Sequence, residues 1–253
     1  VISKLSFHAY AHVFDQYILL DAGSALGFGC GPLLIAQSHI DESAVNEGPV
    51  AIPGELTTAH FLLNLAYPKI KNKVVHIFSD IEEKVLDGTV QAGLIIHENR
   101  FTYAAKGLVK LIDLGQFWED KFNLPIPLGG IFCKRSFSPA LARKINRVIR
   151  RSVEYAFSNP ESPRAYIQAH AQEMDPEVQQ KHIDLYVNDF SVDLGKQGRN
   201  HFWLSQIDCQ TNTSHNHHPR TNHLDHSSHS SQEVDHHLTT ESNQNSDENH
   251  QNE

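Results

Sequence analysis

The stretch HIFSDIEEKVLDGTVQAGLII, residues 76–96, sets the architecture that we expect for this chain. It reads as a strand, a short helix at Ile81–Leu86, a DGT turn and a second strand that ends in the apolar run AGLII. The preceding stretch PVAIPGELTTAHFLLNLAYP, residues 49–68, has the same plan of strand, turn and helix. Such alternation of strands and helices predicts a parallel sheet flanked by helices.

The segments on either side of 49–130 predict a second unit. The first residues read as the end of a strand, a glycine-rich segment leads into another strand, and the sequence from Pro139 onward is helical. We therefore expect an α/β fold of two lobes, the first built from 1–48 plus 131–203 and the second from 49–130. Residues 115–130, which contain two prolines, would cross between the lobes, and ligands would bind in the cleft. A single wider sheet would give the same order of elements.

The composition of the chain changes near residue 204. Residues 204–253 are mostly Asn, Ser, His, Thr and acidic residues, and they hold nine of the 18 histidines. Such a segment buries too little apolar surface to offset its ordering entropy, so we expect a disordered tail. Because the tail has eight acidic residues and one arginine, it carries most of the net charge of −9. The nearly neutral remainder offers no basic surface for nucleic acid or an anionic membrane.

The cysteines and the apolar runs indicate a cytoplasmic protein. Cys30, Cys133 and Cys209 are odd in number and lie far apart, which fits a reducing compartment. No run of about eighteen apolar residues predicts a membrane span, and the first residues lack the pattern of a signal peptide. The sequence begins with Val1 inside an expected strand, which we interpret as the start of a fragment.

The apolar run AGLII stops at His97, which is followed by Glu98, Asn99 and Arg100. Ligands of parallel sheets bind just beyond the carboxyl ends of the strands, so we expect His97 at the mouth of the cleft. An imidazole there can accept a proton near neutral pH, while Glu98 and Arg100 orient its loop. The alternative is a histidine that ends a strand and hydrogen-bonds a loop carbonyl.

Two further segments predict a site for an anion at the same cleft. Thr57 and Thr58 open a helix directly after a strand and a turn, where free backbone amides and the helix dipole favour a carboxylate. Lys4, Leu5 and Ser6 end the first strand in a comparable position. Alternatively, Thr57 is an ordinary helix N-cap and Lys4 a solvated charge.

The sequence indicates neither a metal site nor covalent catalysis. His8 and His12 are spaced to share a helix face, but the sequence shows no third ligand for them. Motifs of phosphate loops, zinc proteases and nucleophilic serine or cysteine enzymes do not occur. Phe101 and Tyr103 could line an aromatic pocket, although aromatic residues at a strand edge more often belong to the core.

The sequence resembles the 1,4-dihydroxy-6-naphthoate synthase family of the futalosine route to menaquinone. The resemblance covers about residues 1–198 and rests on six segments in the family's order: KLSFHAY, GSALGFGCGPLL, AIPGELTTA, AGLIIHENRFTY, LPIPLGGI and HIDLYVNDFSVDLG. It implies a two-lobed fold like that of type II periplasmic binding proteins, used by a cytoplasmic bacterial enzyme without metal or organic cofactor. The implied reaction is that of a carbon–carbon lyase, which converts cyclic dehypoxanthine futalosine, an aromatic carboxylate, to 1,4-dihydroxy-6-naphthoate and dihydroxyacetone.

The resemblance also implies roles for the residues at matching positions. His97 in the IHE motif corresponds to the proton acceptor of the family. The substrate contacts correspond to Lys4, Leu5, Ser6, Thr57 and Thr58. Removal of a proton beside a carbonyl would start a retro-aldol-like cleavage, which the formation of the aromatic naphthoate ring drives forward.

One part of the family pattern is missing at the start of the sequence. Members normally begin with a strand, a polar loop, a helix and a second strand before the segment that matches KLSFHAY. We therefore expect an N-terminally truncated first lobe that lacks its first strand and helix and has an unpaired sheet edge. On this interpretation the chain by itself is unstable or inactive.

Two other functions fit the same fold. A non-catalytic protein that binds small carboxylates would need no base at His97, and the chorismate dehydratase of the same pathway is a sister enzyme. The segments IHENRFTY and PIPLGGI favour the naphthoate synthase. The sequence predicts no partner besides the small-molecule substrate and does not define an oligomeric state.

Overall fold

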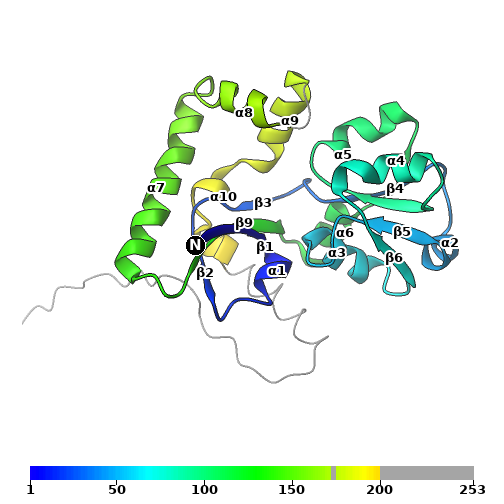
Figure 1. The fold of residues 1–253 in the computed structure, drawn as a ribbon, viewed down its shortest axis with the longest axis horizontal. Helices are drawn as coiled ribbons and strands as arrows, with labels where there is room; N and C mark the ends of the chain where they lie inside the picture. Colours follow the sequence, from blue (N-terminus) through cyan, green and yellow to red (C-terminus); the bar gives the residue numbers. More distant parts are fainter. Residues whose placement is uncertain (172–174, 200–253) are drawn as a thin grey trace, which may run out of the picture.

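The computed structural model describes residues 1–171 and 175–199. These residues form two β-sheets that lie next to each other, each with its own helices (Figure 1). The predicted tail at 204–253 lies outside the described residues. The predicted α/β class is therefore confirmed, and the arrangement of the two sheets positions the candidate site.

The first sheet is antiparallel and is organised around one long strand, β9 (Ile126–Lys134). Strand β9 pairs with β1 (Ile2–Ser6), β2 (Tyr17–Leu19) and β3 (Ala25–Gly27). The helices on the side of this first sheet are α1 (Phe7–Tyr10), α7 (Pro139–Ser158), α8 (Arg164–His170), α9 (Pro176–Tyr186) and α10 (Asp189–Val192). The helical character predicted from Pro139 onward is thus confirmed.

Strand β9 lies where the prolines predict an irregular crossing segment, so that prediction is wrong from Ile126 onward. Proline is normally excluded from a central strand because it cannot donate a ladder hydrogen bond. At Pro127, however, β9 pairs with Leu26 of β3, and its pairing with β1 begins only at Gly129. The proline therefore lies where only one flank of the strand is paired, and the strand can form around it.

The second sheet is mixed and has the order β6–β5–β7–β4–β8. Its strands are β4 (Leu33–Ala36), β5 (Pro49–Ile52), β6 (Asn72–Val75), β7 (Ala92–Ile95) and β8 (Val109–Asp113). Its helical segments are α2 (Glu42–Glu47), α3 (Thr58–Ala66), η1 (Phe78–Asp80), α4 (Ile81–Leu86), α5 (Asn99–Thr102), η2 (Tyr103–Lys106) and α6 (Leu114–Phe122). Strands β5, β6 and β7 are parallel, as predicted, whereas β4 runs antiparallel to β7 and β8. The strand expected to start at His76 lies earlier, because β6 ends at Val75 and residues 78–80 form η1.

Strand β4 also departs from the expected lobe boundaries. It belongs to the second sheet, although the expected first lobe extends to residue 48, and β9 of the first sheet begins before residue 131. Leu33, the first residue of β4, lies opposite Ile95, the last residue of β7. Because the chain enters the second sheet at the carboxyl end of β7, β4 must run away from that edge and is antiparallel. Its four buried apolar residues would suit a central strand of either sheet.

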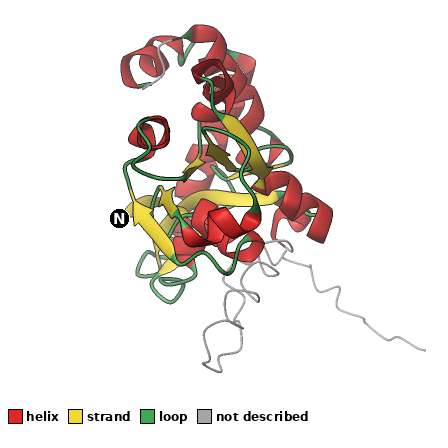
Figure 2. Cartoon of the chain, turned by 90° about the vertical axis from the view of Figure 1, so that its right-hand side faces the viewer, coloured by secondary structure: helices red, strands yellow, loops and turns green. Residues whose placement is uncertain are grey.

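The two faces of the second sheet pack against different helices, because alternate residues of a strand point to opposite sides. Leu34 of β4 belongs to the cluster that contains residues of α3 and α6, whereas Leu33 and Ile35 belong to the cluster formed with α4. Seen from the side of this sheet, the strands lie between helices (Figure 2). Helix α4 has the bounds that the sequence predicts, and its Ile81 and Val85 are fully buried.

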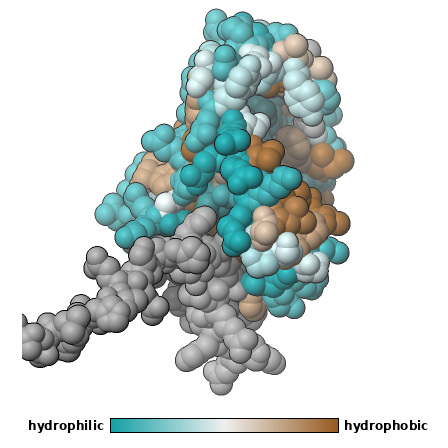
Figure 3. All heavy atoms as spheres, turned by 90° about the vertical axis from the view of Figure 1, so that its left-hand side faces the viewer, coloured by the Kyte–Doolittle hydropathy of each residue, from teal (hydrophilic) through white to brown (hydrophobic). Residues whose placement is uncertain are grey.

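The outer face beside α7 is largely hydrophilic. Figure 3 shows this side of the molecule, on which hydrophobic residues gather in a limited area. In residues 1–171 and 175–199, no helix combines the length and the apolar character that crossing a bilayer requires.

The first crossing between the sheets leaves no room for a side chain at Gly31. A Cβ atom added there would lie 2.2 Å from the Cα atom of Gly115, at the start of α6. We expect Gly31→Ala to lower the free energy of unfolding by about 1–3 kcal/mol, because backbone must shift to relieve the overlap. Urea unfolding followed by circular dichroism measures this loss.

Gly27→Ala is the matched control for this prediction. A Cβ atom at Gly27 would meet the side-chain nitrogen of Asn188 at 3.1 Å, and a side chain can move more readily than backbone. We therefore expect a smaller loss for Gly27→Ala. Equal losses for the two variants would contradict the close approach of Gly31 to α6.

Candidate functional site

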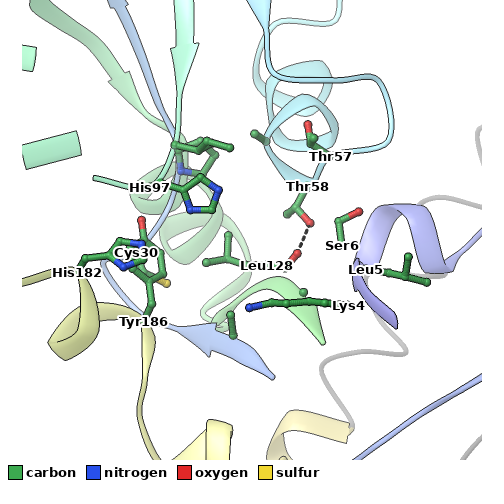
Figure 4. Close-up of a pocket in the computed structure, with 15 residues that line it drawn as sticks. Lys4, Leu5, Ser6, Cys30, Thr57, Thr58, His97, Leu128, His182 and Tyr186 are labelled. Carbon is green, nitrogen blue, oxygen red and sulfur yellow. Dashed lines mark hydrogen bonds between the residues drawn. The ribbon is translucent and has the colours of Figure 1, made fainter. Parts of the chain in front are cut away.

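A cavity of about 300 Å³ lies between the two sheets and is lined by residues from both (Figure 4). Its walls come from the end of β1, from β3, from the crossing segment before β4, from the start of α3, from the residues after β7, from β9 and from α9. The structure brings together all the predicted site residues in this wall: Lys4, Leu5, Ser6, Thr57, Thr58 and His97.

The topology of the second sheet explains why these residues meet. Strands β5 and β7 are parallel neighbours, so their carboxyl ends lie at the same edge of the sheet. Thr57 and Thr58 follow β5, and His97 follows β7. The end of β1 approaches this edge from the first sheet and contributes Lys4 and Ser6 to the same cavity.

His97 has a left-handed backbone conformation, with φ of 57°. Residues other than glycine adopt this conformation rarely, and it persists where surrounding structure holds it. The ring of Phe78 lies edge-on to the imidazole, with ring centroids 5.1 Å apart, and the ring of His182 lies at 5.9 Å. The turn at His97 thus directs its side chain into the cavity, where Figure 4 shows it.

The surroundings of His97 favour the neutral imidazole. Burial lowers its pKa below the usual 6.5; Glu98 opposes this shift, and His182 and Lys4 add to it. Within the described chain the ring makes no hydrogen bond to a loop carbonyl, so the alternative of a purely structural strand-end histidine finds no support in the geometry. A neutral imidazole that faces a cavity can accept a proton from a bound molecule.

The threonine hydroxyls at the start of α3 are already engaged by the protein. Thr57 caps the helix, because its Oγ1 accepts a hydrogen bond from the amide of His60 at 3.1 Å and donates to the carbonyl of Gly54 at 2.7 Å. Thr58 is buried and donates from Oγ1 to the carbonyl of Leu128 in β9 at 2.9 Å, the bond that Figure 4 marks. The N-cap alternative for Thr57 is therefore confirmed.

The backbone amides of Thr58 and Ala59 remain as donors at the same place. The first N–H groups of a helix have no partner within the helix, and both residues line the cavity. These amides and the positive end of the helix dipole can together bind a carboxylate. An anion here would contact backbone rather than the threonine side chains.

The three residues at the end of β1 make different contacts. Ser6 caps α1 by accepting from the amide of Ala9 at 2.9 Å, and its hydroxyl donates to the carbonyl of Leu56 at 2.5 Å, which ties β1 to the loop before α3. The side chain of Leu5 points away from the cavity in Figure 4, so its main chain forms this part of the wall. Lys4 extends into the cavity, and its ammonium makes no hydrogen bond or ion pair with the described residues.

Sequence reasoning missed three residues whose side chains bring a polar or ionisable group to the cavity wall: Cys30, His182 and Tyr186. The two residues of α9 occur in the segment HIDLYVNDFSVDLG, but no local pattern indicates that this helix faces the cleft. Cys30 precedes β4, and burial, with a smaller effect of Glu119, raises the pKa of its thiol to about 12. Cys30 is therefore a neutral thiol near neutral pH, which agrees with the predicted lack of a cysteine nucleophile.

Two histidines of the cavity wall and the neighbouring Glu98 form a group that could bind a divalent ion. The possible ligand atoms of His97, Glu98 and His182 all lie within 4.8 Å of one another. We assign no ion to this group, because the function proposed below uses the free imidazole of His97. The rings of His8 and His12 are 5.6 Å apart and belong to no such group among the described residues.

The residues after His97 hold its loop in place. Arg100 forms an ion pair with Asp113 at 2.8 Å and donates to the carbonyl of Gly31, so the predicted orienting role of Arg100 is confirmed. Tyr103 packs against the core cluster around α4 and does not line the cavity, as the core alternative predicts. The loop thereby joins β8 and the crossing segment beside the candidate site.

Known proteins of two kinds resemble this chain. The family model for menaquinone biosynthesis matches residues 2–201. A 1,4-dihydroxy-6-naphthoate synthase of Thermus thermophilus is 46% identical over 197 residues, which are 78% of this chain and 71% of that protein. The enzyme of the same name from Streptomyces coelicolor is 45% identical over 203 residues, with the same two shares.

Solved structures extend the comparison to the fold. A crystal structure of a protein from Archaeoglobus fulgidus has a TM-score of 0.77 and 32% identity, covering 83% of this chain and 79% of that chain. The alkanesulfonate-binding protein of Xanthomonas axonopodis pv. citri, bound to MOPS, has a TM-score of 0.55 and 11% identity, covering 73% of this chain and 66% of that chain. The two-lobed fold like that of periplasmic binding proteins is therefore confirmed.

The relatives and the family model point to the same pathway, and each match covers more than three quarters of the chain. The family model includes the ends of β1, β5 and β7 and the helix α9, which together surround the cavity. The chain therefore belongs to the menaquinone biosynthesis family, within which its predicted resemblance to the 1,4-dihydroxy-6-naphthoate synthases is confirmed.

Proposed function

We propose that this chain is a carbon–carbon lyase of menaquinone biosynthesis, which converts cyclic dehypoxanthine futalosine to 1,4-dihydroxy-6-naphthoate and dihydroxyacetone. The observation that carries the proposal is the neutral imidazole of His97, which a left-handed backbone turn presents to the cavity between the sheets. The names of the curated relatives support the reaction.

In this proposal the carboxylate of the substrate binds at the edge where the two sheets meet. The amides of Thr58 and Ala59 donate to it, and the unpaired ammonium of Lys4 balances its charge. Thr57 and Ser6 act through the backbone that they cap, since their hydroxyls hold the start of α3 and the end of β1 together. Binding at these donors leaves the rest of the substrate facing His97.

His97 then acts as the general base. It takes a proton from the substrate, the carbon–carbon bond to the three-carbon fragment breaks, and the proton returns to the products. The substrate divides into two products, so the step consumes no water, oxidant or reductant. A correctly placed base contributes roughly 10²–10⁴ to the rate of such a step.

Replacement of His97 by Asn tests the base. Asparagine tolerates a positive φ, so the turn can persist while the proton acceptor is lost. We expect kcat for naphthoate formation from cyclic dehypoxanthine futalosine to fall roughly 10²–10⁴-fold, with substrate affinity changed by less than about threefold. Absorbance and mass spectrometry follow the product, and calorimetry measures binding.

The same measurements separate the proposal from its alternatives. A wild-type chain that binds the substrate without forming naphthoate would instead support a carboxylate-binding protein. Turnover of chorismate in place of cyclic dehypoxanthine futalosine would support the dehydratase. Unchanged kcat in the Asn variant would show that His97 is not the base.

The pH profile tests the electrostatic surroundings of His97. Because desolvation holds the pKa of His97 below 6.5, the acidic limb of kcat/KM should have its midpoint below pH 6.5, where His97 takes up a proton before substrate binds. Lys4→Met removes a positive charge that lowers this pKa, so the acidic limb should move to higher pH. A limb that stays in place or moves to lower pH would contradict the coupling of Lys4 to His97.

Two substitutions of Thr58 test whether backbone amides bind the carboxylate. Thr58→Pro removes one amide at the first helical position, where proline is accommodated after the extended Thr57. Thr58→Val is the matched control, because it loses the same hydroxyl but keeps the amide. Since a hydrogen bond to a charged group is worth about 1.5–3 kcal/mol, we expect only the proline variant to raise KM, by roughly tenfold or more.

Unfolding measurements accompany this comparison. Both Thr58 variants lose the bond to the carbonyl of Leu128, so both should unfold at lower urea concentration than the wild type. An equal rise of KM in the two variants would identify the hydroxyl, rather than the amide, as the substrate contact.

A further inference from the structure

His182 lies beside His97 in the wall of the cavity, although the two residues belong to different halves of the chain. His182 lies on α9, whereas His97 follows β7 of the second sheet. Their ring centroids are 5.9 Å apart, and the ring of Tyr186, one helical turn after His182, packs at 4.5 Å. Both residues of α9 line the cavity (Figure 4). A substrate that contacts His97 would therefore lie within reach of His182 as well.

The imidazole of His182 has an unused polar atom. Its Nε2 is buried, and no residue of the described chain forms a hydrogen bond with it. A buried polar atom without a partner is costly, and its presence in a native structure calls for an explanation, such as a catalytic contact or a bound water or ion. Because Nε2 belongs to a residue of the cavity wall, the bound substrate is the natural partner.

The proposed reaction creates a need for one hydrogen-bond donor. Proton removal by His97 and cleavage of the carbon–carbon bond both move an electron pair onto a carbonyl oxygen of the substrate, which becomes an enolate oxygen. The proton taken by His97 later returns to the products, so the balance of atoms is unchanged. A donor aimed at that oxygen stabilises the transition state more than the ground state, because the negative charge develops only during the step.

We propose that His182 is a second catalytic residue, whose Nε2–H donates a hydrogen bond to the substrate oxygen that becomes negative while His97 holds the proton. This inference rests on the proposed lyase function and names the group that stabilises its intermediate. A neutral imidazole serves this purpose, since it can donate from one ring nitrogen without carrying a charge.

The surroundings of His182 agree with a neutral donor. Burial lowers its pKa below 6.5, with Glu98 opposing the shift and Lys4 adding to it. The positive charge of Lys4 also favours negative charge in the cavity. In this proposal His97 and His182 have different tasks at adjacent positions in the cavity wall: His97 transfers the proton, and His182 stabilises the negative charge.

Two substitutions distinguish a donor from a packing residue. His182→Leu fills similar space without a polar atom, whereas His182→Gln retains an N–H group that can donate but cannot act as a base near neutral pH. We expect kcat for cyclic dehypoxanthine futalosine to fall roughly 10²–10³-fold in the Leu variant, with KM changed by less than about threefold. The kcat of the Gln variant should be at least tenfold higher than that of the Leu variant, because glutamine restores a donor.

A second measurement uses the wild-type chain and does not depend on turnover. With ¹⁵N-labelled histidine, NMR reports which ring nitrogen of His182 carries the proton, and the signal is assigned from its loss in the Gln variant. On addition of 1,4-dihydroxy-6-naphthoate, whose ring hydroxyl oxygens derive from the reacting carbonyls, we expect a protonated Nε2 whose resonance shifts.

The outcomes are separable from those of the proposed function. Wild-type turnover with a Leu variant of unchanged kcat would overturn the role of His182 while leaving the lyase intact. Equal defects in the Leu and Gln variants, or an Nε2 resonance that does not respond to the naphthoate, would also overturn it. If the wild type forms no naphthoate, the lyase function is refuted, and the role of His182 is refuted with it.

Discussion

The parallel pairing of β5 with β7 is the constraint on which the cavity depends. Val50 and Ala51 lie opposite Ala92 and Gly93, so both strands run to one edge, and the segments that follow them meet there. Gly93 also lets α4 pack directly on β7, because a Cβ atom there would lie 2.6 Å from Cγ2 of Ile81. A shift of either strand by one residue would exchange its two faces and separate the start of α3 from His97.

The polar groups at this edge fall into two classes. The hydroxyls of Ser6, Thr57 and Thr58 bond to main-chain carbonyls, and those of Ser6 and Thr58 join segments that are far apart in the sequence. The imidazole of His97 and the ammonium of Lys4 instead face the cavity without such partners in the described chain. Groups that are not used in structural bonds can form hydrogen bonds or transfer protons with a bound molecule, so these two side chains are suited to chemistry.

Local patterns predicted most helices and the parallel part of the second sheet. Apolar spacing and capping residues act within a few positions, so α4 and α7 begin and end close to where the sequence indicates. The two main errors concern β4 and β9. An apolar run such as Leu33–Ala36 can complete either sheet, and Pro127 is compatible with a strand only because of its register.

The sequence by itself determined one half of the candidate site. His97 ends a buried strand, Thr57 and Thr58 open a helix, and Lys4 lies in the first strand, and each of these positions follows from residues nearby in the chain. Only the tertiary structure decided that α9 brings His182 against His97 and that the amides of α3, rather than its hydroxyls, are free for an anion. Both depend on contacts between segments distant in sequence, which no local periodicity or capping pattern encodes.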